Sequence, residues 1–83
     1  MKVSILNLHC LNAVCDDDED VASIVADVRQ STHGNVGAEE IVGCLGELER
    51  EGMVSRVQDV SGADWFRITP KGREELDANW VEE

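Results

Sequence analysis

The apolar positions of the chain follow a helical period in its first half, alternate over a short stretch, and then become helical again. Val21, Ile24, Val25 and Val28, for example, recur at the i, i+3, i+4 and i+7 spacing of one helix face. The full pattern predicts an α+β fold with helices over about residues 4–15, 18–30 and 38–51, a β-hairpin over residues 53–69 and a last helix over residues 70–81.

The first predicted helix is apolar around most of its circumference, and His9 and Asn12 form a narrow polar seam. Such a helix is buried on most sides, either in the core or in a contact between subunits. The acidic run of residues 16–20 follows, where carboxylates cap free N–H groups and complement the positive end of the next helix. The run lacks the spaced ligands and turn glycine of an EF-hand loop, so we expect no calcium site.

The third predicted helix has a readable start and end. Gly37 takes the N-cap position, Val36 can contact Ile41 across the first turn, and Gly52 provides the stop. Four apolar residues form its buried stripe, and the opposite face carries glycines and charges. The stripe is Ile41, Cys44, Leu45 and Leu48, and the outward face is Glu39, Gly43, Gly46 and Arg50, flanked by Glu40 and Glu47.

Residues 53–60 and 65–69 have the composition of two strands joined by a turn over residues 61–64. Thr69 suits an N-cap and Pro70 the first helical position, so the second strand passes directly into the last helix.

The last predicted helix has one special position near its start and an apolar pair near its end. Gly72 has no side chain, which lets the helix lie close against a neighbour. Leu76 and Trp80 are four residues apart and can pack together. A homodimer would use this end or the apolar first helix.

The chain of 83 residues is short enough to form one domain, residues 1–83, and its net charge is −11. Residues 1–49 carry −8, residues 50–73 carry +2 and residues 74–83 carry −5. The middle window is therefore the one candidate phosphate-binding surface, unless its cations pair with nearby carboxylates. The cations are Arg50, Arg56, Arg67, Lys71 and Arg73, and the carboxylates are Glu51, Asp59, Asp64 and Glu74.

Nothing in the sequence indicates an enzyme or a cofactor. The motifs of serine hydrolases, zinc proteases and phosphate-binding loops are all missing, and His9 and His33 stand outside any catalytic pattern. The three cysteines include no C-x₂-C pair, which favours free, largely buried thiols in a reducing cytoplasm. No apolar stretch approaches the roughly 18 residues of a membrane span. A zinc site, the alternative for the cysteines, would use Cys10, Cys15, His33 and Cys44.

Two segments resemble winged-helix regulators. Residues 45–54 carry the paired leucines, charged run, glycine and valine that end the third helix of that fold. Residues 65–76 resemble the aromatic–aromatic–arginine stretch, followed by threonine and by glycine–arginine, that leaves the wing in MarR-type and PadR-type regulators. The resemblance covers roughly residues 18–78. It implies a single winged helix-turn-helix domain with three helices, a short β-hairpin wing and a C-terminal helix.

In such regulators the third helix enters the major groove of DNA and the wing contacts the backbone or the minor groove. The resemblance therefore implies a small DNA-binding transcriptional regulator that contacts phosphate through the five cations of the middle window. The third helix departs from the family pattern, because its outward face offers carboxylates and glycines where amides, hydroxyls or cations are usual. The alternative is a module that binds a protein partner through the apolar first helix or through Glu39, Gly43, Gly46 and Glu47.

The composition adds a hypothesis about the source. Few lysines, many carboxylates and abundant valine resemble proteins from salt-loving archaea. In molar salt the Debye length is only about 3 Å, so an acidic surface repels phosphate less.

Overall fold

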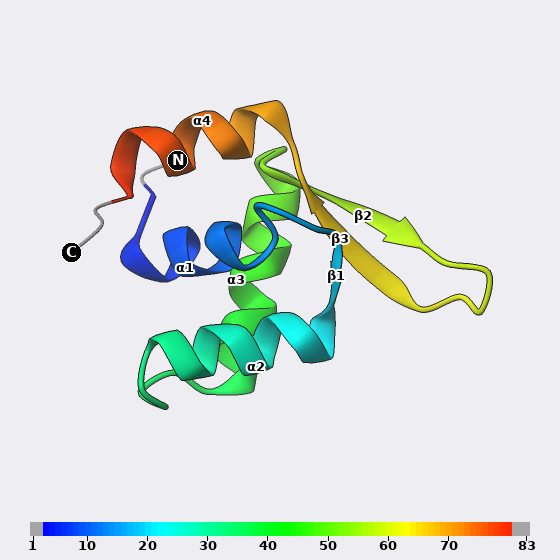
Figure 1. The fold of residues 1–83 in the computed structure, drawn as a ribbon, viewed down its shortest axis with the longest axis horizontal. Coiled ribbons are helices and arrows are strands. Elements are labelled where there is room, and N and C mark those ends of the chain that lie inside the picture. The colour runs from blue at the N-terminus through cyan, green and yellow to red at the C-terminus, as the bar shows by residue number, and fades with distance from the viewer. Residues whose placement is uncertain (1–2, 81–83) are drawn as a thin grey trace.

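The computed structural model describes residues 3–80, and Figure 1 shows their arrangement. The order of helices and hairpin is the predicted one. The last helix ends at Asn79 and Trp80 is its extended C-cap, so the predicted end at residue 81 is too late. Residue 81 itself, like the other outermost residues of the predicted domain, lies outside the described residues. In chain order the elements are α1 (Ile5–Ala13), β1 (Glu19–Asp20), α2 (Val21–Ser31), α3 (Ala38–Arg50), β2 (Val54–Gln58), β3 (Asp64–Ile68) and α4 (Pro70–Asn79).

α1 lies in the middle of the helical body and contacts α2, α3 and α4 (Figure 1). It starts with a reciprocal pair of hydrogen bonds, in which the Asn7 amide donates to Ser4 Oγ and the Ser4 amide donates to Asn7 Oδ1. It ends at Ala13, two residues before the predicted end. The amides of Val14 and Cys15 bond three residues back, at 3.2 and 3.3 Å, which tightens the chain out of the α-helix.

The prediction that the second helix begins at residue 18 is wrong. Glu19 and Asp20 form the short strand β1, which pairs antiparallel with Phe66 and Trp65 of β3. The sheet order is β1-β3-β2, so β1 covers an edge of β3 that the hairpin alone would leave open. Asp20 still caps α2 as expected, because its Oδ1 accepts from the Ser23 amide at 2.8 Å.

The predicted boundaries of α3 are correct to within one residue. Gly37 is the N-cap, without a side-chain hydrogen bond, and Gly52 follows the helix with a φ of +76°. The Met53 amide donates to the Leu48 carbonyl at 2.9 Å, and the Gly52 amide donates to the Glu49 carbonyl. These two bonds form a Schellman motif, which requires the left-handed conformation that glycine adopts without strain. The chain thereby turns directly from α3 into the sheet.

β2 and β3 form the wing, which projects away from the helical body (Figure 1). The first strand ends at Gln58 rather than at residue 60, so the turn is longer and starts earlier than the predicted residues 61–64. Asp59 explains the shift. Its carboxylate accepts hydrogen bonds from the Ser61 and Ala63 amides, from Ser61 Oγ and from the Trp65 indole, so it organises a turn instead of a ladder.

Gly72 places α4 directly against the start of the sheet. Thr69 caps the helix by accepting from the Gly72 amide, and Pro70 is its first residue, as predicted. A Cβ added at Gly72 would lie 2.1 Å from the Met53 carbonyl oxygen. The close approach inferred from the sequence is therefore a contact with the backbone that connects α3 to β2.

The buried side chains form one cluster that draws on every long element. Leu11, Ile24, Leu45, Phe66 and Leu76 represent α1, α2, α3, β3 and α4 in it. In the described part of the chain, Asn7 is the one buried polar side chain. Its side-chain Nδ2 donates to Cys44 Sγ at 2.9 Å. The cluster holds the wing and α3 at fixed positions relative to each other.

Candidate nucleic-acid interface

One face of α3, opposite its buried stripe, is open to solvent along the whole helix. The four residues predicted for partner binding lie together on this face: Glu39, Gly43 and Glu47 are exposed and Gly46 is half-buried. A Cβ added at Gly43 or Gly46 has no atom within 4 Å. A partner can therefore approach the helix backbone closely at both glycines.

Sequence reasoning missed Val42, which lies beside Gly43 with 50% of its surface exposed. The sequence did contain a signal for this residue: Val42 is apolar but lies outside the buried stripe of α3, so its side chain has no place in the core. The outward face therefore combines carboxylates, bare backbone and one methyl-bearing side chain.

The cations predicted for phosphate binding do not lie on one surface. The register pairs Arg56 with Phe66 and Arg67 with Ser55, so the two arginines point to opposite faces of the hairpin. Lys71 donates to the Glu51 carbonyl at the end of α3, and Arg73 donates to the carbonyl of Cys15 after α1. A basic stretch of sequence is thus distributed around the base of the wing.

Two of the wing arginines form ion pairs with the protein's own carboxylates. Arg56 contacts Glu49 at 3.1 Å and Asp64 at 3.0 Å, and its guanidinium carbon lies 5.1 Å from the Phe66 ring centroid. Arg67 contacts Asp18 at 2.8 Å. Among the carboxylates predicted as partners, Asp64 takes this role. The other two partners were not predicted: Glu49 lies in the last turn of α3, seven residues before Arg56, and Asp18 lies between α1 and β1, 49 residues before Arg67.

These ion pairs leave the arginines available to another anion. The side chains of all three pairs are between 32% and 59% exposed, and exposed pairs of this kind contribute about 0–1 kcal/mol. The hydrogen bonds and charge of Arg67 lower the pKa of Asp18, and those of Glu49 raise the pKa of Arg56, so both groups are charged at neutral pH. A phosphate can replace any of the three carboxylates, Asp18, Glu49 or Asp64, at small cost. Arg50, at the end of α3, has no ion pair within the described part of the chain.

The wing tip depends on the charge of Asp59. Its hydrogen bonds with Ser61 and Trp65 lower the pKa of this carboxyl to about 2. An unfolded aspartate has a pKa of about 3.9, so the folded tip holds this proton more weakly than the unfolded chain does. The contribution of Asp59 to stability is therefore fully present above about pH 4 and is lost as the pH falls toward about 2.

We expect an acid titration to show this effect at Trp65. The indole N–H of Trp65 donates to Asp59 Oδ2 at 2.9 Å, so its NMR signal should move with the Asp59 carboxyl, with a midpoint near pH 2. The Asp59→Asn variant should lose this transition, and the Trp80 indole serves as the internal reference. A Trp65 midpoint at the ordinary aspartate value would contradict the assignment.

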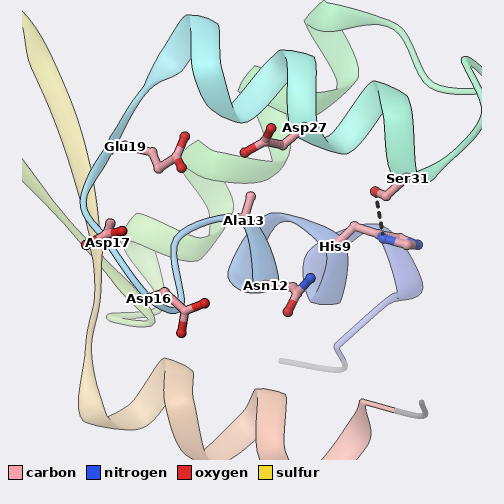
Figure 2. A pocket seen from close by; sticks show the side chains of 8 residues that line it. All are labelled: His9, Asn12, Ala13, Asp16, Asp17, Glu19, Asp27 and Ser31. Carbon is pink, nitrogen blue, oxygen red and sulfur yellow. Dashed lines mark hydrogen bonds between the residues drawn. The ribbon is translucent and has the colours of Figure 1, made fainter.

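A pocket on the helical body, apart from α3 and the wing, is acidic and does not suit phosphate. α1, α2 and the segment between them surround a pocket of about 320 Å³, shown in Figure 2. Burial, followed by the charge of Asp27, raises the pKa of Glu19 in its wall. In the described part of the chain, no three His, Cys, Asp or Glu side chains are placed to hold a metal ion. The lining residues are His9, Asn12, Ala13, Asp16, Asp17, Glu19, Asp27 and Ser31.

The fold brings together only two of the four residues of the alternative zinc site, Cys10 and Cys44, and the described residues contain no group of three possible ligands. Cys10 and Cys44 lie buried in the core, and Cys15 is half-buried after α1. A hydrogen bond to Cys44, together with burial, raises the pKa of the Cys10 thiol. His33 lies in the turn between α2 and α3, where its φ is +56°.

The residues predicted for self-association lie on α1 and at the end of α4. Ile5 is 75% exposed, whereas Trp80 is half-buried with its ring edge-on to His9 at a centroid distance of 5.4 Å. A groove of about 460 Å³ runs between α1 and α4 beside Leu76 and Trp80. Self-association through this side stays a prediction. No helix in residues 3–80 is both long and apolar enough to cross a membrane.

Comparison with known proteins shows the fold. No protein-family model and no curated protein matches the sequence. Among solved structures, the transcriptional regulator BldR of Sulfolobus solfataricus is 25% identical, with a TM-score of 0.74 over 94% of this chain and 53% of that one. A MarR-family regulator of Silicibacter pomeroyi is 20% identical, with a TM-score of 0.78 over 94% and 50% of the two chains. PadR of Bacillus subtilis, solved with operator DNA, is 15% identical, with a TM-score of 0.81 over 96% and 49%.

The predicted winged helix-turn-helix fold is therefore confirmed, as is its similarity to MarR-family and PadR-family structures. The chain spans about half the length of each of these three structures. The matched part covers at least 94% of this chain.

Proposed function

We propose that the chain is a non-enzymatic, DNA-binding transcriptional regulator of the winged-helix type, with α3 in the major groove and the wing on the phosphate backbone. One observation carries the proposal: the outward face of α3 is open along its whole length beside a projecting wing. The same fold occurs in PadR solved with operator DNA. Three free cysteines, without a disulfide in the described residues, are in keeping with a reducing cytoplasm.

The acidity of the chain determines how such binding must work. A net charge of −11 opposes approach to DNA at low salt, so phosphate contacts are confined to Arg50, Arg56, Arg67 and the two cations of α4. Arg56 and Arg67 bind by exchanging a carboxylate for a phosphate. At high salt the long-range repulsion is screened, as in the salt-adapted setting that the composition suggests.

The test is a titration of duplex DNA at several KCl concentrations with two variants, one expected to weaken binding and the other to strengthen it. Arg56→Ala should weaken binding to all sequences alike and reduce the salt slope by about 1, because one phosphate contact is lost. Glu49→Gln should strengthen binding, because it removes one of the two carboxylates that pair with Arg56 and leaves the cation in place. Failure of the wild-type chain to bind any duplex from dilute to molar KCl would overturn the proposal.

A second candidate function has support from the glycines of α3. Gly43 and Gly46 have open space above them and lie beside the exposed carboxylates Glu39 and Glu47. A basic protein segment that packs against the helix backbone would fit this surface. Capture of such a partner by the wild-type chain, with loss of capture in the Gly43→Ala/Gly46→Ala variant, would favour this function over DNA binding.

A further inference from the structure

The chemistry of α3 restricts which bases it can recognise, an inference that rests on the proposed function. Between Ala38 and Glu49 no side chain of α3 carries an N–H donor. Arg50, the last residue of the helix, is the first cation on it. Guanine presents two acceptors, N7 and O6, in the major groove and needs such a donor. The N-terminal part of α3, which reaches the base edges in helix-turn-helix proteins, therefore has no group that reads guanine.

Two side chains in that part of α3 are free to contact bases. Glu39 is exposed and has no hydrogen bond to another described residue, and Val42 lies three residues later on the same side of the helix, half exposed. Gly43 adds no bulk beside them, since an added Cβ there would meet nothing within 4 Å. The helix backbone can therefore approach the groove closely at this point.

Glu40 is the natural comparison for Glu39. Both carboxylates lie in the first turn of α3, where they interact favourably with the helix dipole. The Glu40 side chain turns back toward the helix start, with Oε1 4.0 Å from the position of a Cβ on Gly37. Glu39 is exposed on the outward face and has no hydrogen bond to another described residue.

We propose that α3 selects a cytosine through Glu39 and a neighbouring thymine through Val42. A carboxylate accepts from the N4 amino group of cytosine, whereas the acceptors of guanine repel it, and adenine places its N7 acceptor beside the amino group. The Val42 methyl groups fit the C5 methyl group of thymine, a contact that needs no hydrogen bond. The Glu39 carboxylate is thus a means of base selection, and together with Val42 it restricts the target to pyrimidines on the strand that faces the helix N-terminus.

The experiment selects binding sites from a randomised duplex pool with the full chain and then measures affinities for single-base variants of the selected site. The wild-type chain should enrich one cytosine adjacent to thymine and lose at least about fivefold in affinity when that cytosine is replaced. Glu39→Gln should change the preferred base from cytosine to adenine, since an amide pairs with the adenine N6 and N7. Glu40→Gln removes the same charge from the same turn and should leave the base preference unchanged.

The thymine contact is tested by replacing thymine with deoxyuridine, which removes the C5 methyl group alone. The wild-type chain should bind the deoxyuridine site about threefold more weakly, and Val42→Ala should bind both sites equally. Circular dichroism verifies that the variants are folded. Selected sites that lack a C·G pair next to a T·A pair, or a C·G preference that survives Glu39→Gln, would overturn the inference while DNA binding stands. Binding to no duplex at all would instead overturn the proposed function.

Discussion

Gly72→Ala should destabilise the fold by about 3 kcal/mol, the upper end of the range for overpacked sites. The added methyl group would lie 2.1 Å from the Met53 carbonyl oxygen and 3.0 Å from Ile68 Cγ1. This oxygen belongs to the backbone and already accepts a hydrogen bond from the Thr69 amide, just before α4. The Met53 amide donates to the Leu48 carbonyl, so the same residue connects α3 to the start of α4. The clash cannot be relieved by a change of rotamer, so α4 must move away from the sheet.

Thermal unfolding measures this effect. A loss of about 3 kcal/mol in a domain of this size lowers the Tm by roughly 15 °C. Gly43→Ala is the matched control, because the same methyl group meets no atom within 4 Å there and should stabilise the exposed helix by about 1 kcal/mol. A Gly72→Ala protein with the wild-type Tm would show that α4 does not pack against Met53 as described.

Phe66→Ala should cost about 3–5 kcal/mol, the range for removing a buried aromatic ring. Phe66 is 2% exposed, and its strand lies between β1 and β2, so the ring connects all three strands to the helical core. The total stability of a domain of this length is about 4–12 kcal/mol, so the loss removes a large share of it. The guanidinium of Arg56 lies over the Phe66 ring, and the substitution also removes this cation–π contact.

Urea unfolding of three variants separates these contributions. Phe66→Leu keeps most of the buried volume and should lose less than half as much stability as Phe66→Ala. Arg67→Ala, at the next position but with an exposed side chain, should change stability by less than about 1 kcal/mol, because it removes one surface ion pair. Equal losses for Phe66→Ala and Arg67→Ala would contradict the placement of the ring in the core.

Much of the fold could be predicted because the signals are local. Helix ends depend on residues three or four positions apart, as at Gly37 and Gly52, or on direct succession, as at Thr69 and Pro70. The division of α3 into a buried and an exposed face follows from helical periodicity alone. The resemblance of two segments to winged-helix regulators then identified the fold to which this order of elements belongs.

The candidate site was predicted less completely, because one of its ion pairs spans a long sequence distance and the face that each arginine occupies depends on the strand register. Asp18 and Arg67 are 49 residues apart, and no local pattern connects them. Strand alternation, once the register is known, sends Arg56 and Arg67 to opposite faces, whereas the sequence shows only five cations in one window. The turn at Asp59 was misplaced because strand composition continues through Val60, which is fully exposed.

By itself, the sequence determined the helices, the hairpin, the glycine positions and the open face of α3, since each follows from the spacing of neighbouring residues. Only the tertiary structure decided that Glu19 and Asp20 form a strand, that Gly72 contacts the Met53 carbonyl and that the wing arginines are already paired. The physical reason is the same in each case. Pairing and close packing depend on groups that folding brings together from distant parts of the chain, and their partners are fixed only when the core has formed.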